Sequence, residues 1–179
     1  MSFSDLALQL LAGWLIADLL SGVVHWLEDR VLCVGLPVLG RHVVAPNRLH
    51  HLDPAAFLRQ SVWSRNSTTW LTTLAIAAAW LWTAGFSFIW LAALVGGLVV
   101  TEVHVRAHRP TGSEMWATLQ EIGVLQSRRQ HWQHHRGAMD RRYCVLTGWL
   151  NPILDVLRVW ERLEAALTTI GLQPNRGTK

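Results

Sequence analysis

Three long apolar segments alternate with polar stretches along the chain. They cover residues 6–26, 68–84 and 86–104, so each contains 17 to 21 residues. Helices of these lengths extend about 26 to 31 Å, close to the thickness of the hydrocarbon core of a bilayer. The pattern predicts an all-α integral membrane protein with about three transmembrane helices, built as one membrane-embedded domain over residues 1–179.

The first apolar segment differs from a cleaved signal peptide. No basic residue precedes it, and it contains Asp18 and His25. A signal peptide instead begins with a positively charged region, followed by an apolar stretch. We therefore expect this segment to remain in the mature protein as a transmembrane helix.

Shorter apolar patterns predict elements at the membrane surface. Residues 31–40 are apolar but too few to span a bilayer, which favours a re-entrant or interfacial segment. Apolar residues recur at helical spacing over 151–167 and, more weakly, over 113–126. Asn151 and Pro152 are of the types that favour the N-cap and the first position of a helix. We expect interfacial amphipathic helices in both places.

The composition agrees with a membrane protein. The chain is 51% apolar and only 16% charged, with 11 tryptophans and a mean hydropathy of +0.23. Disordered chains are more polar than this, and soluble domains carry more charge. The two cysteines lack the spacing of a metal or redox motif.

The distribution of basic residues predicts an orientation. None precedes the first apolar segment, five separate the first from the second, none lies between the second and the third, and 11 follow. The positive-inside rule then places the N-terminus outside and the C-terminal part in the cytoplasm. Because the basic residues are separated by apolar segments, the net charge of +4 does not indicate a nucleic-acid partner. Arginine outnumbers lysine 15 to 1, which indicates a GC-rich coding genome. Such a genome favours a bacterial plasma membrane as the location.

Eight of the nine histidines fall in four groups at the predicted cytoplasmic boundary. Residues three or four apart on a helix share a face, so two imidazoles can point at one metal ion. Imidazole suits iron, zinc, copper or nickel, and eight such ligands exceed the needs of one ion. We therefore expect about two ions, with the HxxHH group shared between them, and a cytoplasmic-side metal site. The ligand candidates are His25, His50, His51, His104, His108, His131, His134 and His135, and His42 is left outside the site.

Three aspartates are candidate catalytic residues beside these histidines. Asp18 and Asp29 flank His25, and a carboxylate within a membrane span is costly enough to indicate a function. Each could hold a ligand imidazole by its second nitrogen or bind metal directly. The alternative for Asp29 is an ion pair with a nearby arginine. Asp53 follows the histidine pair and precedes Pro54, so its alternative is a turn or helix cap.

The order and spacing of these residues resemble those of a known family. Over residues 17–164 the chain is similar to the plasmanylethanolamine desaturase family, which also includes a plant chloroplast phosphatidylglycerol desaturase. The stretches that carry the resemblance are Ala17-Asp18, Ser21-Gly22, Val24-His25-Trp26, Asp29, Pro46, Arg48, His50-His51-Leu52-Asp53-Pro54, His104 and His108, Leu119-Gln120, His131, His134 and His135, Cys144 and Gly148-Trp149-Leu150-Asn151.

The resemblance implies a membrane enzyme with a histidine-bound di-iron centre. Such an enzyme uses O2 and an external electron donor, a reductase with a ferredoxin or a cytochrome b5-type protein, to remove two hydrogens from a lipid chain. The eight grouped histidines match the family's histidines and would be the iron ligands. The chain departs from the family at Gln130, where a histidine is frequent, and at Thr101, where an asparagine is frequent. Either departure would alter the site if the family residue binds metal.

The chemistry of the residues agrees with this implication. Side-chain acids and bases cannot break an unactivated C–H bond, so a metal that activates O2 is needed. We expect desaturation of an alkyl or acyl chain on an intact glycerophospholipid, forming a vinyl ether in the alkyl case. Arg41, Arg48, Arg106 and Arg109 are either headgroup contacts or topology signals only.

Three other functions remain open from the sequence. A membrane hydroxylase would use the same histidines. A zinc hydrolase would need an acid–base carboxylate such as the glutamate of HExxH, and no histidine pair here encloses one. A non-catalytic metal-binding or haem protein would use only two to four of the histidines.

Overall fold

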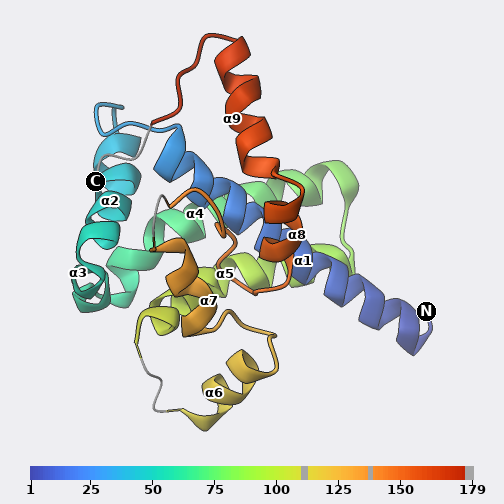
Figure 1. Cartoon of the computed structure of the whole chain (residues 1–179). Helices are drawn as coiled ribbons and strands as arrows, with labels where there is room; N and C mark the ends of the chain where they lie inside the picture. Colours follow the sequence, from blue (N-terminus) through green and yellow to red (C-terminus); the bar gives the residue numbers. More distant parts are fainter. Residues whose placement is uncertain (110–112, 137–138, 176–179) are drawn as a thin grey trace.

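The computed structural model describes residues 1–109, 113–136 and 139–175, and every regular element in these ranges is a helix (Figure 1). This confirms the all-α prediction. The elements are α1 Phe3–Arg30, the π-helix η1 Gly40–Val44, α2 Ala45–Leu52, α3 Pro54–Arg59, α4 Val62–Ala84, α5 Phe88–His108, α6 Glu114–Glu121, α7 Arg128–His134, α8 Leu150–Val156 and α9 Val159–Thr169.

Two of the described helices, α1 and α5, are long and apolar enough to cross a membrane. Their outer faces carry exposed apolar side chains such as Leu8, Leu19 and Val95, as expected of helices in contact with lipid. The remaining predicted span lies in α4, a helix of 23 residues that is more polar because it contains several threonines and Asn66. The number of spans therefore stays a prediction.

Local signals explain where the long helices begin and end. The Ser2 and Asp5 side chains form a capping box at the start of α1. Serine side chains at positions 61 and 87 accept a backbone N–H at the starts of α4 and α5. Gly85 ends α4 with a φ of 74°, a left-handed conformation that suits glycine. The short link that follows makes α4 and α5 an antiparallel pair.

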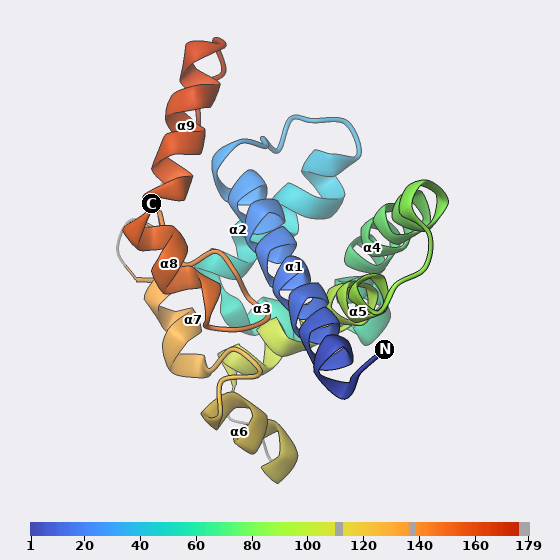
Figure 2. The same cartoon turned by 90° about the vertical axis from the view of Figure 1, so that its right-hand side faces the viewer.

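Small residues allow α1 and α5 to pack closely. A Cβ atom added at Gly96 of α5 would lie 2.6 Å from the Cβ of Ala17 on α1. At Gly13 of α1 an added Cβ would overlap the carbonyl of Ile89. Transmembrane helices commonly associate through such small-residue contacts. Helix α5 also packs against α4 and α7, and it lies between α1 and α4 in the bundle (Figure 2).

The elements that carry histidines gather at one end of the helix bundle. In Figure 1 the N-terminus and the link between α4 and α5 lie on the right, and α2 and α3 lie on the left. His25 lies near the C-terminal end of α1, and both histidines of α5 lie near its C-terminal end. The fold thus brings four distant parts of the sequence to the same end.

The predicted amphipathic helix over 151–167 is wrong in two respects. It is broken into α8 and α9 at Leu157 and Arg158, and Arg158 has a left-handed φ of 52°. Asn151 is not an N-cap, because it lies inside α8 and is fully buried. Its side chain accepts the Cys144 N–H at 3.0 Å and donates to the Cys144 carbonyl at 2.8 Å. A tertiary contact thus uses the side chain that the local pattern assigns to the cap.

The other two short segments take simple forms. Residues 31–39 form turns without a regular helix, and η1 follows directly. Residues 113–126 contain α6, which is shorter than the predicted pattern.

Candidate metal centre

The eight grouped histidines and Asp29 form two adjacent clusters. The first, called here the five-histidine group, consists of His50 from α2, His104 and His108 from α5, and His131 and His135 from α7 and its C-cap. The second, called the Asp29 group, consists of His25 and Asp29 from α1, His51 from α2 and His134 from α7. Within each group, one candidate ligand atom per residue lies within 4.8 Å of all the others.

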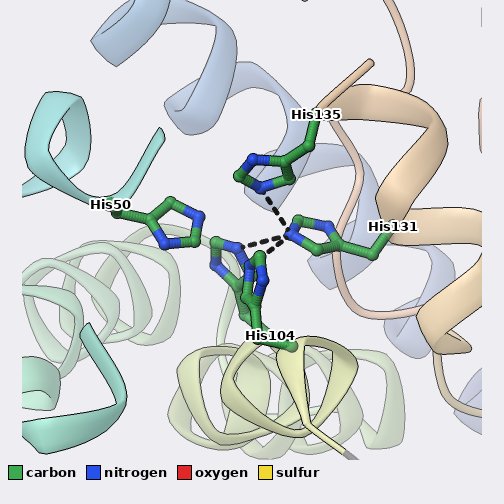
Figure 3. Close-up of side chains that lie close together, drawn as sticks. His50, His104, His131 and His135 are labelled. Carbon is green, nitrogen blue, oxygen red and sulfur yellow. Dashed lines mark hydrogen bonds between the residues drawn. The ribbon is translucent and has the colours of Figure 1, made fainter. Parts of the chain in front are cut away.

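Three members of the five-histidine group converge on one atom of a fourth, His131 Nε2 (Figure 3). It lies 3.0 Å from His104 Nε2, 2.7 Å from His108 Nε2 and 2.9 Å from His135 Nε2. A single imidazole nitrogen has either one proton or one lone pair, so it cannot hydrogen bond to three others at once. Imidazole nitrogens bind metal ions at about 2.0 to 2.1 Å. Two ligands at right angles around an ion are therefore about 3.0 Å apart, the spacing observed here.

Asp29 is the centre of the second group. Its Oδ1 atom is 2.9 Å from His51 Nε2 and accepts a hydrogen bond from Asn47 Nδ2 at 2.5 Å. Its Oδ2 atom is 3.2 Å from His134 Nε2 and 3.6 Å from His25 Nε2. Three imidazoles and one carboxylate are a common donor set for a divalent transition metal.

Backbone carbonyls orient two imidazoles of the Asp29 group. His25 Nδ1 lies 3.1 Å from the Tyr143 carbonyl, and His134 Nδ1 lies 2.7 Å from the Arg141 carbonyl. A carbonyl can only accept, so each Nδ1 carries the proton and each Nε2 presents a lone pair. Both Nε2 atoms and Asp29 Oδ2 are buried without a hydrogen-bond partner in the described part of the chain. Buried polar atoms left in this way fit a metal ion.

Three histidines outside the long helices are held neutral by their surroundings. Burial, reinforced by neighbouring imidazoles, lowers the pKa of His50 and His131, and it lowers the pKa of His135 to about 2. Metal binding requires the neutral form, so these side chains can bind a metal without first losing a proton.

The predicted ligands thus come together in the two groups. The HxxHH histidines divide between the groups: His131 and His135 lie in one and His134 in the other. Their role as ligands stays a prediction.

Asp18 lies elsewhere and contacts no histidine group in the described structure. It is fully buried, and its carboxylate accepts the backbone N–H groups of Leu146 and Thr147 at 3.1 and 2.8 Å and the Thr147 hydroxyl at 2.6 Å. Asp18 therefore ties the segment before α8 to α1. Asp53 is the C-cap of α2 and forms an exposed ion pair with Arg59 at 3.0 Å, so the turn or cap alternative describes it.

The two departures from the resembled family lie outside both groups. Thr101 donates its hydroxyl to Thr69 at 3.1 Å. Gln130 forms a capping box with Ser127 at the start of α7. Each side chain is satisfied by a neighbour that is not a candidate ligand.

A cavity of about 460 Å³ leads from the histidines along α1, α4 and α5. His25, His50 and His104 form part of its wall, and Ile76, Trp80, Trp90 and Leu94 line it further along α4 and α5. Polar side chains at the histidine end are Glu28, Arg41, His42, Asn47, Gln60, Ser64 and Arg65.

Two residues of this region were missed by the sequence reasoning. Asn47 lies four residues before His51 on the same helical face, a spacing that could have identified it. Glu28 lines the cavity, and no side chain of the described chain forms an ion pair or hydrogen bond with its carboxyl group. The sequence feature that could have identified Glu28 is its position, three residues after His25. His42, expected to lie outside the metal site, belongs to neither group but does line the cavity.

Comparison with known proteins gives related sequences over almost the whole chain. Mouse plasmanylethanolamine desaturase 1 is 32% identical over 174 residues, covering 88% of this chain and 63% of the mouse protein. The plasmanylethanolamine desaturase of Myxococcus xanthus is 29% identical, covering 93% and 62%. Chloroplastic fatty acid desaturase 4 of Arabidopsis thaliana is 31% identical, covering 91% and 52%.

The chain thus spans about three fifths of the length of the two plasmanylethanolamine desaturases. No solved structure gives a significant match. The lipid desaturase domain model matches residues 14–177, and this chain therefore belongs to the lipid desaturase domain family.

Proposed function

We propose that this protein is a lipid desaturase that uses two iron ions, O2 and an external electron donor to introduce a double bond into a chain of an intact glycerophospholipid. The observation that carries the proposal is the apolar cavity whose wall includes histidines of both groups. Relatives named as plasmanylethanolamine desaturases support an ether-linked substrate and a vinyl ether product.

The donor set supports a pair of ions in place of one structural zinc. Five imidazoles in one group exceed the four ligands of tetrahedral zinc, and the described residues provide no cysteine in either group. Bound at these sites, iron would supply the O2 activation needed for C–H cleavage. In the overall reaction the chain loses two hydrogen atoms, the donor gives two electrons, two protons are taken up, and O2 leaves as two water molecules.

The protein's own part is to position the lipid chain and to exclude water. Apolar side chains of α4 and α5 would surround the chain, and a lipid could enter laterally from the membrane. The histidines lie at the polar end of the cavity, so they would reach the methylenes nearest the headgroup. We therefore expect the new double bond near that end.

Residues at the polar end suit a charged headgroup. Arg41 is exposed, lines the cavity and has no ion-pair partner among the described residues, so it could bind a phosphate. Glu28 could accept a headgroup ammonium. Arg106, by contrast, is bound to Glu102 at 2.9 Å and lies 4.1 Å over the Trp116 ring, so its role is structural.

Turnover of a labelled lipid tests the proposal. The purified protein in nanodiscs is given O2, a reduced electron donor and a plasmanylethanolamine. The alkyl tail of this lipid is deuterated beyond its first methylenes. We expect a product two mass units lighter, and we expect His51→Ala to abolish it. An exposed change remote from the cavity, Arg158→Ala, serves as the control and should retain activity.

Other products would identify other functions. A product sixteen mass units heavier would indicate hydroxylation. Turnover only of a coenzyme-A thioester would contradict the phospholipid substrate.

A further inference from the structure

Helix α7 and the residue after its C-cap carry three exposed arginines. Arg128, Arg129 and Arg136 line a shallow surface pocket together with Trp132 and Gln133. We call the three arginines the basic patch. No carboxylate of the described residues pairs with any of the three guanidinium groups, whereas Arg30, Arg65 and Arg142 are each paired with a carboxylate.

Trp132 connects the basic patch to the five-histidine group. Its ring centroid lies 5.8 Å from that of His135 and 6.2 Å from that of His108. His131, one residue before it, is fully buried at the centre of the same group. A single short helix therefore separates the candidate metal centre from the basic surface.

The basic patch and the lipid cavity lie on different parts of the molecule. The cavity is lined by α1, α4 and α5, with residues of η1, α2 and α3 at its histidine end, and none of the basic-patch residues contributes to it. Figure 2 shows α7 and α4 on opposite sides of α1. A partner could thus reach α7 while a lipid occupies the cavity.

We propose that the basic patch docks the acidic face of a soluble one-electron carrier protein and that Trp132 provides the shortest contact to the metal ligands. The proposal rests on the proposed function, because desaturation needs two electrons for each O2 reduced. Three unpaired cations would steer an acidic partner and fix its orientation. Electron-transfer encounters are small and short-lived, so a patch of this size is sufficient.

Charge reversal tests the docking surface without requiring turnover. The triple variant Arg128→Glu, Arg129→Glu, Arg136→Glu is compared with the charge-matched triple variant Arg59→Glu, Arg158→Glu, Arg162→Glu, which changes exposed arginines of α3 and α9. The Kd of the full chain in neutral nanodiscs is measured for an acidic ferredoxin and for a soluble cytochrome b5 domain. Iron content and thermal unfolding show whether each variant is folded.

We expect the wild-type chain to bind at least one of these carriers, with a Kd that rises between 10 and 150 mM salt. Over this range the Debye length falls from about 30 to about 8 Å. The basic-patch variant should bind at least about tenfold more weakly, and the control variant within about twofold of wild type. No binding of either carrier to the wild-type chain, or an equal Kd for both triple variants, would overturn the proposal. So would a loss confined to binding of phosphatidylglycerol vesicles, which would assign the patch to the membrane.

Substitution of Trp132 tests the contact separately. Trp132→Leu should leave the Kd and the iron content unchanged but slow reduction of the metal centre by the bound carrier, and Trp132→Phe should restore part of the rate. An unchanged reduction rate in Trp132→Leu would show that Trp132 has no part in the transfer. Retained carrier binding with no lipid turnover would contradict the proposed function and leave the docking surface supported.

Discussion

Asp18 and Asp29 lie on the same helix but have different surroundings. All partners of the Asp18 carboxylate come from residues 146 and 147, whereas the Asp29 carboxylate faces three imidazoles and one amide. The backbone N–H and hydroxyl donors around Asp18 satisfy its carboxylate completely. Asp29 has one buried oxygen without a hydrogen bond in the described chain, as a metal ligand would have.

This difference predicts opposite results for two alanine substitutions. Asp18→Ala leaves two buried N–H groups unpaired, and each costs about 1 to 3 kcal/mol, so thermal unfolding in detergent should occur at a clearly lower temperature. The folded fraction should keep its metal. Asp29→Ala should instead lower metal affinity by at least about 10- to 100-fold with a smaller effect on unfolding. Asp53→Asn is the matched control, and equal metal loss in all three variants would contradict the assignment.

The histidines could be predicted from the sequence because their spacing is local. His104 and His108, or His131 and His135, share a helix face whatever the tertiary fold. The two aspartates could not be separated in this way. The partners of Asp18 are 128 and 129 residues away, and the amide that orients Asp29 comes from a different helix.

Helix α5 holds the site together, because it packs on α1 and supplies two histidines of the five-histidine group. Its contact with α1 depends on Gly96, which faces Ala17 and Leu146. The distance between His25 on α1 and His104 on α5 therefore depends on residues two turns or more away from both.

Gly96→Ala should destabilise the protein. In a helix, alanine is favoured over glycine by about 1 kcal/mol. Here the added Cβ would lie 2.6 Å from Ala17 Cβ and 3.1 Å from Leu146 Cδ2, and such overpacking costs about 1 to 3 kcal/mol. The steric effect should win, so thermal unfolding should shift to a lower temperature. Gly35→Ala, where an added Cβ has no neighbour within 4 Å, is the control; a higher unfolding temperature for Gly96→Ala would contradict the close packing.

The long helices could be predicted from hydropathy, but the break between α8 and α9 could not. Apolar spacing continues across α8 and α9, yet the chain turns at Arg158. The tryptophan of α9, Trp160, stacks on Trp26 of α1, and Arg30 binds Glu164 at 2.7 Å. These distant contacts fix the direction of α9 independently of local propensity.

At the scale of the whole molecule, the fold and the distribution of basic residues agree. The N-terminus and the link between α4 and α5 lie at one end, and α2 and the C-terminal ends of α1 and α5, which carry histidines, lie at the other (Figure 1). The basic residues follow the same division. The predicted orientation places the candidate metal centre and the basic patch together on the cytoplasmic side.

A topology reporter tests this orientation. Alkaline phosphatase is active only outside the cytoplasm. Green fluorescent protein fluoresces in the cytoplasm but stays dark when it is exported unfolded. Fused after Lys179, the fluorescent protein should fluoresce and the phosphatase should be inactive. An active phosphatase and a dark fluorescent fusion would reverse the orientation.

Elemental analysis of the purified full chain shows whether each of the two groups binds one iron ion. We expect about two irons per chain, because the two groups have separate ligand sets. His51→Ala should remove the ion of the Asp29 group and His135→Ala that of the five-histidine group, leaving about one iron in each variant. One zinc per chain, or two irons retained in both variants, would contradict the account.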